Sequence, residues 1–249
     1  MKLSIIIPTY QESKRLARTA DELRQACAAM ELRPEILVVD DGSTDDTVEV
    51  ARKCLAPFPA ARVLCRSPNR GKGYVVREGM LAARGDFRLF MDADGSTRMT
   101  EIGRFLTHMG EAEIVIASIG LREATVTRRQ PFPRGVAGKI ANLVIQLLAL
   151  PGIKDTQRGF KMFSARAAED IFRRCSIDGW AFDVEALAVG RRLGYRIKEL
   201  PVTWEHREDS RVGVASYFGT LIDLLRVRWR LWRGDYDAER REPDPRHTG

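Results

Sequence analysis

The chain has 249 residues, enough for one large α/β domain. Of these, 44% are hydrophobic and 30% charged, which is an ordinary composition for a soluble protein. Its net charge of +7 favours acidic partners: nucleic acid, phosphorylated metabolites or an anionic membrane surface. The sequence shows no secretory signal pattern and no run of about 18 apolar residues that could span a bilayer. The cysteines are far apart, without a CxxC pair or a histidine partner, which argues against zinc and favours buried free thiols in a reducing cytosol.

Strand and helix patterns alternate along the first half of the chain. Apolar runs typical of strands buried in a parallel sheet occupy residues 2–8, 35–39, 62–65, 86–91 and 113–118. Between them, helices are predicted over residues 16–30, from Ser43 onward, over 71–84 and over 99–109. We expect Ser43 to cap the second helix, with Asp46 completing a capping box. The alternation predicts right-handed βαβ units and a doubly wound, mostly parallel sheet, which is an α/β fold.

Polar residues follow three of the predicted strands, at positions 8–12, 40–43 and 92–94. Ligands of such sheets bind beyond the carboxyl ends of the strands, so these residues are expected at one site. Asp92 and Asp94 share a strand face, and two convergent carboxylates suit a hard divalent ion that also binds phosphate. An isolated DxD also fits a polar turn in which Asp94 or Ser96 caps the next helix. The coincidence of three polar strand ends favours a metal–diphosphate site.

The segment 69–73, NRGKG, is glycine-rich and basic. Its glycines would let the backbone approach a ligand closely while Lys72 meets a phosphate. Taken alone, the segment fits a plain helix N-terminus equally well. Neither the Walker A spacing nor GxGxxG is present, which argues against a P-loop NTPase and against an NAD enzyme.

Two later segments have strongly apolar helical patterns. The first, over residues 136–150, fits either a core helix or one in a membrane interface. The second, over 217–232, places two tryptophans beside Arg226, Arg230 and Arg233, which suits anionic headgroups and equally a helix packed on the sheet with a solvated basic edge. No RNP, KH or zinc-knuckle signature supports RNA binding. The charged segment 235–249 is expected to fray.

Seven segments, in order, carry a resemblance to a known family: SIIIPTYQE, VVDDGSTDDT, NRGKGYVVREGML, MDADGST, KDTQRGFKMF, GWAFDVE and LPVTWEHREDSRV. With them the chain resembles the inverting family 2 glycosyltransferases of GT-A fold, in particular the dolichyl-phosphate glucosyltransferase and dolichol-phosphate mannose synthase branch. GKGYVVREGM, DADGST and DTQRGFKMF resemble the glucosyl enzymes more. The resemblance implies a glycosyltransferase domain over 1–215, an amphipathic, membrane-interfacial helix over 216–234 and a charged tail over 235–249.

The resemblance also implies roles for individual residues. Asp41 would meet the nucleotide base, and the whole nucleotide-sugar pocket would comprise Pro8, Tyr10, Glu12, Asp41, Lys72 and Asp92. Asp92 and Asp94 would hold Mg²⁺ or Mn²⁺. Ser96 stands where the mannose synthases often carry a glutamine ligand, which leaves the third protein ligand open. The acceptor phosphate or the diphosphate would be contacted by Arg134, Arg207, Ser210 and Arg211.

The implied reaction is an inverting, metal-dependent transfer of a hexose, glucose from UDP-glucose first of all, to a polyprenyl or dolichyl monophosphate. Because a phosphate monoester has a second pKa of about 6, the acceptor arrives largely ionised and a strong general base is dispensable. The candidate catalytic residues are Asp94, Asp155 and Asp183. Asp155 either orients the acceptor or sugar or is a turn aspartate. Asp183 and Glu185 fall in the family's catalytic-base region, where we expect a positioning role.

Three alternatives stay open. The chain could be a polyprenyl-phosphate mannosyltransferase using GDP-mannose, a soluble family 2 enzyme with a hydroxyl acceptor and Asp183 or Asp155 as base, or a nucleotide-sugar-binding subunit without activity. A nucleic-acid partner is not expected, because it would rest on charge only. We expect a cytoplasmic protein, peripheral on the cytoplasmic face of a membrane, that reaches its lipid through its apolar helices, as a homo-oligomer or with a membrane partner subunit.

Overall fold

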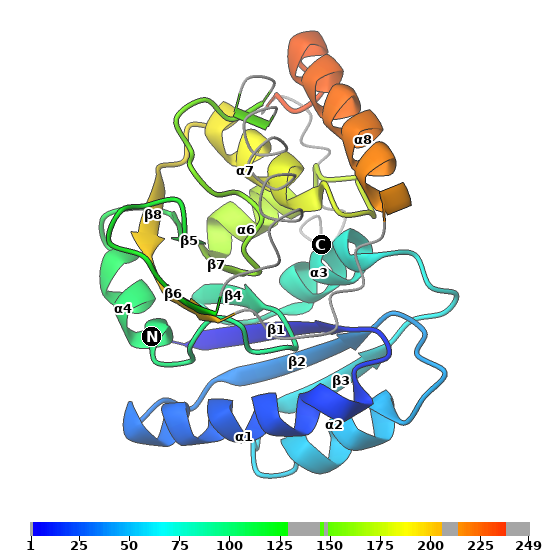
Figure 1. Ribbon diagram of the computed structural model, residues 1–249, viewed down its shortest axis with the longest axis vertical. Coiled ribbons are helices and arrows are strands. Elements are labelled where there is room, and N and C mark those ends of the chain that lie inside the picture. Colours follow the sequence, from blue (N-terminus) through cyan, green and yellow to red (C-terminus); the bar gives the residue numbers. More distant parts are fainter. Residues whose placement is uncertain (1, 129–144, 147–148, 206–213, 238–249) are drawn as a thin grey trace, which may run out of the picture.

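The computed structural model describes residues 2–128, 145–146, 149–205 and 214–237, with side chains from 219 onward in the last range (Figure 1). Its centre is a seven-stranded sheet in the order β3-β2-β1-β4-β7-β5-β8. The strands are β1 (Leu3–Thr9), β2 (Glu35–Asp40), β3 (Ala61–Cys65), β4 (Phe87–Met91), β5 (Ile114–Ser118), β7 (Phe160–Ser164) and β8 (Ile197–Pro201). A second, two-stranded sheet pairs β6 (Thr125–Arg128) with β9 (Thr203–Glu205).

Helices cover both faces of the large sheet, as the alternation of strands and helices predicts (Figure 1). The helices are α1 (Ser13–Ala29), α2 (Thr47–Leu55), α3 (Lys72–Ala82), α4 (Glu101–His108), α6 (Ala165–Phe172), α7 (Phe182–Arg192) and α8 (Val214–Arg233). Buried side chains of α1, α2 and α4 form one core cluster, and those of α3, α6, α7 and α8 form the other. The expected α/β fold with a mostly parallel sheet is confirmed.

The central strands contribute to both core clusters, which explains why they are apolar at nearly every position. In β1, Ile6 packs in the cluster of α3 while Ile5 and Ile7 pack in that of α1. In β4, Phe90 packs in the cluster of α3 and Leu89 in that of α1. A strand that is buried on both faces has no solvated side, so the period-two pattern of a half-buried strand is missing.

One strand of the large sheet, β7, runs antiparallel to both of its neighbours, β4 and β5. Its register places Phe160 opposite Met91, so β7 starts where β4 ends. The backbone N–H of Asp92 donates to the carbonyl oxygen of Gly159 at 2.9 Å. The segment that precedes β7 therefore lies against the acidic turn that follows β4.

The predicted capping box at Ser43 is wrong. Helix α2 begins at Thr47, and within the described part of the chain its N-cap Asp46 makes no side-chain capping bond. The Ser43 hydroxyl instead donates to Asp40 Oδ1 at 2.5 Å and accepts the backbone N–H of Gln11 at 2.9 Å. Ser43 is thus used to join the ends of β1 and β2, and the helix starts four residues later.

The predicted C-terminal helix is present as α8, and it packs on α7 through one side only. Leu224 and Val227 are buried, whereas Leu221, Ile222, Leu225, Trp229 and Trp232 are 44–79% exposed. Among the described residues no helix is long and apolar enough to span a bilayer. The helix expected over 136–150 lies mostly outside the described residues. Of the few residues of this range that are described, Ile145 and Leu150 are buried in the core.

The segment after α8 starts with packed residues, so the expectation of fraying from residue 235 is wrong for its described part. The Tyr236 side chain is buried, and its hydroxyl donates to Glu185 Oε1 at 2.8 Å. Asp237 forms an ion pair with Arg192 at 2.5 Å. The folded unit therefore extends to residue 237.

All four cysteines are free thiols, as expected, but they are not all buried. Cys27 and Cys175 are buried, Cys54 is half-buried and Cys65 at the end of β3 is exposed. Burial raises the pKa of the Cys27 thiol to about 11, so this thiol is unreactive near neutral pH.

Candidate active site

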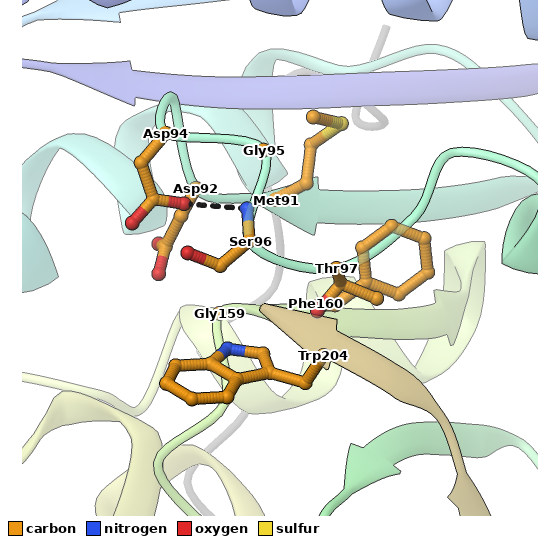
Figure 2. A pocket seen from close by; sticks show the side chains of 9 residues that line it. All are labelled: Met91, Asp92, Asp94, Gly95, Ser96, Thr97, Gly159, Phe160 and Trp204. Atoms are coloured by element: carbon orange, nitrogen blue, oxygen red, sulfur yellow. Dashed lines mark hydrogen bonds between the residues drawn. The ribbon is translucent and has the colours of Figure 1, made fainter. Parts of the chain in front are cut away.

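The acidic turn after β4 is the centre of the candidate site. Figure 2 shows the side chains of Asp92 and Asp94 leaving this turn on the same side, where they line a small pocket with Ser96, Gly159 and Trp204 among others. Asp94 Oδ1 accepts the backbone N–H of Ser96 at 2.8 Å, which closes the turn. The alternative that Asp94 or Ser96 caps the next helix is wrong, because α4 starts at Glu101 after the N-cap Thr100.

Gly159 provides the space that the Asp92 side chain occupies. A Cβ atom at residue 159 would lie 2.1 Å from both carboxylate oxygens of Asp92. Any larger residue would have to displace Asp92. The DTQRGF segment therefore lies at the acidic turn. Its separation from Asp92 in the sequence gives no indication of this contact.

Lys72, the first residue of α3, places its ammonium group on the acidic turn. Its Nζ lies 2.5 Å from Asp92 Oδ1 and 5.5 Å from the centre of the Trp180 ring. Burial lowers the pKa of Lys72, but the nearby carboxylates of Asp92, Asp183 and Asp94 outweigh burial and leave the pKa raised. The acidic turn is thus paired with an ammonium group of the chain itself, and the metal–diphosphate site stays a prediction.

The loop that carries Lys72 is held from two sides. Asp41 accepts the backbone N–H of Arg70 at 2.9 Å and that of Gly71 at 2.7 Å, so this carboxylate fixes the start of α3. On the other side, the Gly73 N–H donates to the carbonyl oxygen of Asp178 at 2.7 Å. A Cβ at Gly71 would lie 2.5 Å from that oxygen, which explains why glycine is needed at this close approach.

The remaining residues expected in a nucleotide pocket lie at the same edge of the sheet. Pro8 is buried near the end of β1, Tyr10 beyond it is 41% exposed, and Glu12 forms a 2.7 Å ion pair with Arg15. Thr9 pairs with Asp40 in the parallel register, which brings these residues beside Asp41. The acceptor-phosphate residues Arg134, Arg207, Ser210 and Arg211 lie outside the described residues.

Asp183, in the first turn of α7, is paired with a fully buried lysine that sequence reasoning missed. Lys161 Nζ of β7 donates to Asp183 Oδ1 at 2.7 Å and also to the carbonyl oxygen of Arg158. Burial raises the pKa of Asp183, while the ammonium groups of Lys161 and Lys72 oppose that rise. The available signal was a lysine at a strand position, in FKMFS, whose neighbours are apolar.

Asp155 has the contacts of a turn aspartate. Its carboxylate accepts the backbone N–H groups of Ile119 at 3.1 Å and Gln157 at 3.2 Å, and it forms an ion pair with Arg158 at 3.1 Å. These bonds shape the loop that delivers Gly159 to the acidic turn. Of the two interpretations of Asp155, the described contacts therefore favour the turn.

Glu185 is completely buried, and it positions a loop. Its carboxylate accepts the backbone N–H groups of Ser176 and Ile177, at 2.9 and 2.8 Å, and the hydroxyl of Tyr236. The loop held in this way includes Asp178, whose carbonyl oxygen anchors α3. Glu185 thus contacts the loop that anchors α3, and its expected positioning role stays a prediction.

Within the described residues no group of three or more His, Cys, Asp or Glu side chains is arranged to hold a metal. The oxygen-bearing side chains that line the pocket at the acidic turn include those of Asp92, Asp94 and Ser96. These hard oxygen donors match Mg²⁺ or Mn²⁺, which keep open positions for phosphate oxygens.

The comparison with known families identifies the class of protein to which this fold and its acidic turn belong. The model of the family described as "Glycosyl transferase family 2" matches residues 4–172, and the chain belongs to this family. It is 34% identical to a dolichyl-phosphate beta-glucosyltransferase of Trichomonas vaginalis, over 92% of this chain and 72% of that protein. It is 32% identical to the human dolichyl-phosphate beta-glucosyltransferase, over 96% and 78% of the two chains.

Solved structures with the same fold are glycosyltransferases of GT-A type. One is glucosyl-3-phosphoglycerate synthase of Mycobacterium tuberculosis in complex with Mn²⁺, UDP and phosphoglyceric acid, with a TM-score of 0.69, 17% identity and coverage of 98% of this chain and 80% of that chain. Another is mannosyl-3-phosphoglycerate synthase of Rubrobacter xylanophilus, with a TM-score of 0.67, 19% identity and coverage of 98% and 78%. At these identities the likeness establishes the fold, and the GT-A expectation is confirmed.

Proposed function

We propose that this protein transfers glucose from UDP-glucose to a polyprenyl or dolichyl monophosphate, with inversion at the anomeric carbon and with a divalent metal ion. The relatives named above support the reaction class. The observation that carries the proposal is the 2.5 Å contact between Lys72 and Asp92. It joins a basic helix N-terminus, suited to a diphosphate, and an acidic turn, suited to a metal, at one edge of the sheet.

Asp92 and Asp94 would hold the Mg²⁺ or Mn²⁺ ion. When bound, this ion supplies Lewis-acid stabilisation of the departing nucleoside diphosphate. The residues of this chain fit such an ion, because they present hard oxygens on one side of a turn that already attracts an ammonium group. Lys72, beside Asp92 at the start of α3, would bind the diphosphate oxygens.

The remaining residues bind and orient the two substrates. Asp41 fixes the loop of Lys72, and Pro8, Tyr10, Glu12 and Asp41 border the place proposed for the nucleoside. Arg134, Arg207, Ser210 and Arg211 are proposed for the acceptor phosphate or the diphosphate. An oxygen of the acceptor phosphate forms the bond to the anomeric carbon while the bond from that carbon to the UDP oxygen breaks, and UDP leaves with the electron pair.

The lipid acceptor implies work at a membrane surface, and α8 supports this part of the proposal. Its exposed stripe consists of Leu221, Ile222, Leu225, Trp229 and Trp232. The guanidinium of Arg233 lies 4.5 Å from the centre of the Trp229 ring, which combines an interfacial aromatic with a cation for anionic headgroups. We place the protein peripherally on the cytoplasmic face of a membrane, with a homo-oligomer or a membrane partner subunit as further means of contact.

The experiment that tests the proposal is a product assay with UDP-glucose, GDP-mannose and UDP-GlcNAc, each offered with a short polyprenyl phosphate and Mn²⁺. The expected product is the polyprenyl phosphate that carries glucose from UDP-glucose. Mannosyl product from GDP-mannose would identify a mannosyltransferase. Transfer to hydroxyl acceptors without lipid would identify the soluble enzyme, and tight UDP binding without turnover would identify a binding subunit.

A further inference from the structure

Trp180 is a large aromatic side chain that stays exposed beside the acidic turn. It lies directly before α7, and 42% of its surface is exposed. The centre of its ring lies 5.5 Å from Lys72 Nζ, which in turn lies 2.5 Å from Asp92 Oδ1. An exposed tryptophan next to a polar site is informative, because packing in the core does not account for it.

The loop that leads to Trp180 lies near both α3 and α8 (Figure 1). On the side of α3, a Cβ at Gly71 would lie 2.5 Å from the carbonyl oxygen of Asp178. On the side of α8, a Cβ at Gly179 would lie 3.3 Å from Asp223 Oδ2, and these two residues line one cavity. Trp180 is therefore joined to α8 through the residue before it, while its ring faces the start of α3.

The large hydrophobic side chains that are exposed among the described residues are few and grouped. One is Tyr10, just beyond β1, and five form the exposed stripe of α8. The remaining one is Trp180. Ile222 of the stripe directly precedes Asp223, the residue of α8 that Gly179 approaches. Trp180 thus provides apolar surface between the acidic turn and the exposed stripe of α8.

We propose that Trp180 binds the first isoprene units of the acceptor, and that the prenyl chain continues from there onto the exposed stripe of α8. This inference rests on the proposed transfer to a polyprenyl phosphate, and it identifies a residue that selects for the prenyl chain. The indole ring suits this role, because it offers a large and rigid apolar face at a small cost in conformational entropy.

The direction of attack assigns Trp180 to the acceptor and not to the nucleotide. Inversion requires the acceptor oxygen to approach the anomeric carbon from the face opposite the departing diphosphate. The nucleoside is proposed at the ends of β1 and β2, where Asp41 holds the loop of Lys72 from one side. Asp178 and the nearby Trp180 contact that loop from the other side. An acceptor that enters over Trp180 thus meets the sugar opposite the nucleotide.

The first test compares Trp180→Ala with Phe58→Ala, which changes a half-buried aromatic after α2 in the other core cluster. Geranyl phosphate, a short prenyl acceptor, keeps the reaction in solution, so that binding to vesicles does not contribute. We expect the KM for geranyl phosphate to rise about tenfold or more in Trp180→Ala only, which is the effect of losing one large apolar contact. The KM for UDP-glucose should stay unchanged, and Trp180→Phe should restore most of the acceptor affinity.

The split between the kinetic constants decides among the roles of Trp180. A KM for geranyl phosphate that is unchanged in Trp180→Ala would overturn the inference. A rise confined to the KM for UDP-glucose would assign the ring to the donor sugar, and a loss of kcat alone would make it a support for Lys72. Either result would overturn the inference while leaving the proposed function intact. Absence of glucosyl product from geranyl phosphate with the unmodified protein would instead contradict the proposed function.

A second test needs no variant, and it decides the question if thermal unfolding shows that Trp180→Ala is not folded. A prenyl phosphate that carries a benzophenone at the end of its chain is irradiated with the unmodified protein, UDP and Mn²⁺. Mass spectrometry then identifies the labelled peptides. We expect labelling of the peptides that contain Trp180 and residues 221–225, and we expect excess geranyl phosphate to suppress it. Labelling confined to other segments, or no labelling that geranyl phosphate suppresses, would overturn the inference.

Discussion

Asp92 and Gly159 are joined by a backbone hydrogen bond of 2.9 Å, and the Asp92 carboxylate occupies the space in which a Cβ of residue 159 would lie. Gly159→Ala should therefore displace Asp92 and lower glucose transfer about 100-fold, because misplacing a reacting group by about 1 Å has an effect of this size. Initial rates across a Mn²⁺ titration measure the loss. Gly110→Ala is the control, since a Cβ there meets nothing within 4 Å. An unchanged rate for Gly159→Ala would contradict the role of Asp92.

Asp94→Ala removes one of the two proposed metal ligands. We expect the initial rate at matched metal concentration to fall more than about 100-fold, since changes to the partners of metal ligands alone cost 10-fold to 100-fold. Asp21→Ala on α1 is the control, because Asp21 is 53% exposed and pairs with Arg24 on its own helix. Rates for Asp94→Ala equal to those of the control would refute the metal assignment.

Lys72→Met should change metal binding and turnover in opposite directions. Without the ammonium on Asp92, a divalent ion no longer competes with a resident positive charge, so Mn²⁺ should bind several-fold more tightly in the absence of nucleotide. Turnover should nevertheless fall about 100-fold, because the leaving diphosphate loses a charged donor. Calorimetric Mn²⁺ titration and steady-state rates measure the two effects. Weaker Mn²⁺ binding would show that Lys72 organises the acidic turn instead of competing for it.

Trp229→Glu tests the membrane surface proposed for α8. Trp229 is 53% exposed, so the substitution should not disturb the core. We expect binding to vesicles that contain phosphatidylserine to fall about tenfold or more, the equivalent of burying one large apolar side chain. Gln25→Glu on α1 introduces the same charge on another exposed helix and serves as control. Activity on a short water-soluble acceptor should be retained, and equal vesicle binding by both variants would contradict the proposal.

Tyr236→Phe removes the hydroxyl that donates to the buried Glu185 carboxylate at 2.8 Å. Leaving a buried acceptor with one partner fewer should lower the free energy of unfolding by about 1–3 kcal/mol. Chemical denaturation measures the change, and Tyr195→Phe, at a half-buried hydroxyl bonded to Asp170, provides the comparison. A smaller loss for Tyr236 than for Tyr195 would show that the segment after α8 contributes little to the fold.

The sequence was informative wherever local pattern and chemistry coincide. The apolar runs ending in Asp40 and Asp92 predicted both the buried strands and the edge of the sheet at which carboxylates gather, because the carboxyl ends of parallel strands share one edge. The basic loop before α3 was a candidate because of its glycines and Lys72, a pattern that fitted a plain helix N-terminus equally well. Its contact with Asp92 follows from β1 lying between β2 and β4.

Other features depend on contacts between distant segments, which no local pattern reveals. The antiparallel insertion of β7 brings Gly159 against Asp92, across 67 residues of sequence, and an apolar run carries no sign of its direction. Ser43 had the spacing of a helix cap, but its hydroxyl is taken by Asp40. Tyr236 stands in a charged segment that favoured disorder, yet the buried Glu185 provides a partner for it.

The reversed direction of β7 divides the molecule into parts that evolution can alter separately. The segment from β1 to β4 ends at the acidic turn, whereas the path from β5 to β7 returns to that turn from the opposite direction through a long connection. The pairing of Phe160 with Met91 holds the glycine before β7 in register against β4 whatever the length of that connection. Insertions or replacements within the connection thus require no rebuilding of the acidic turn.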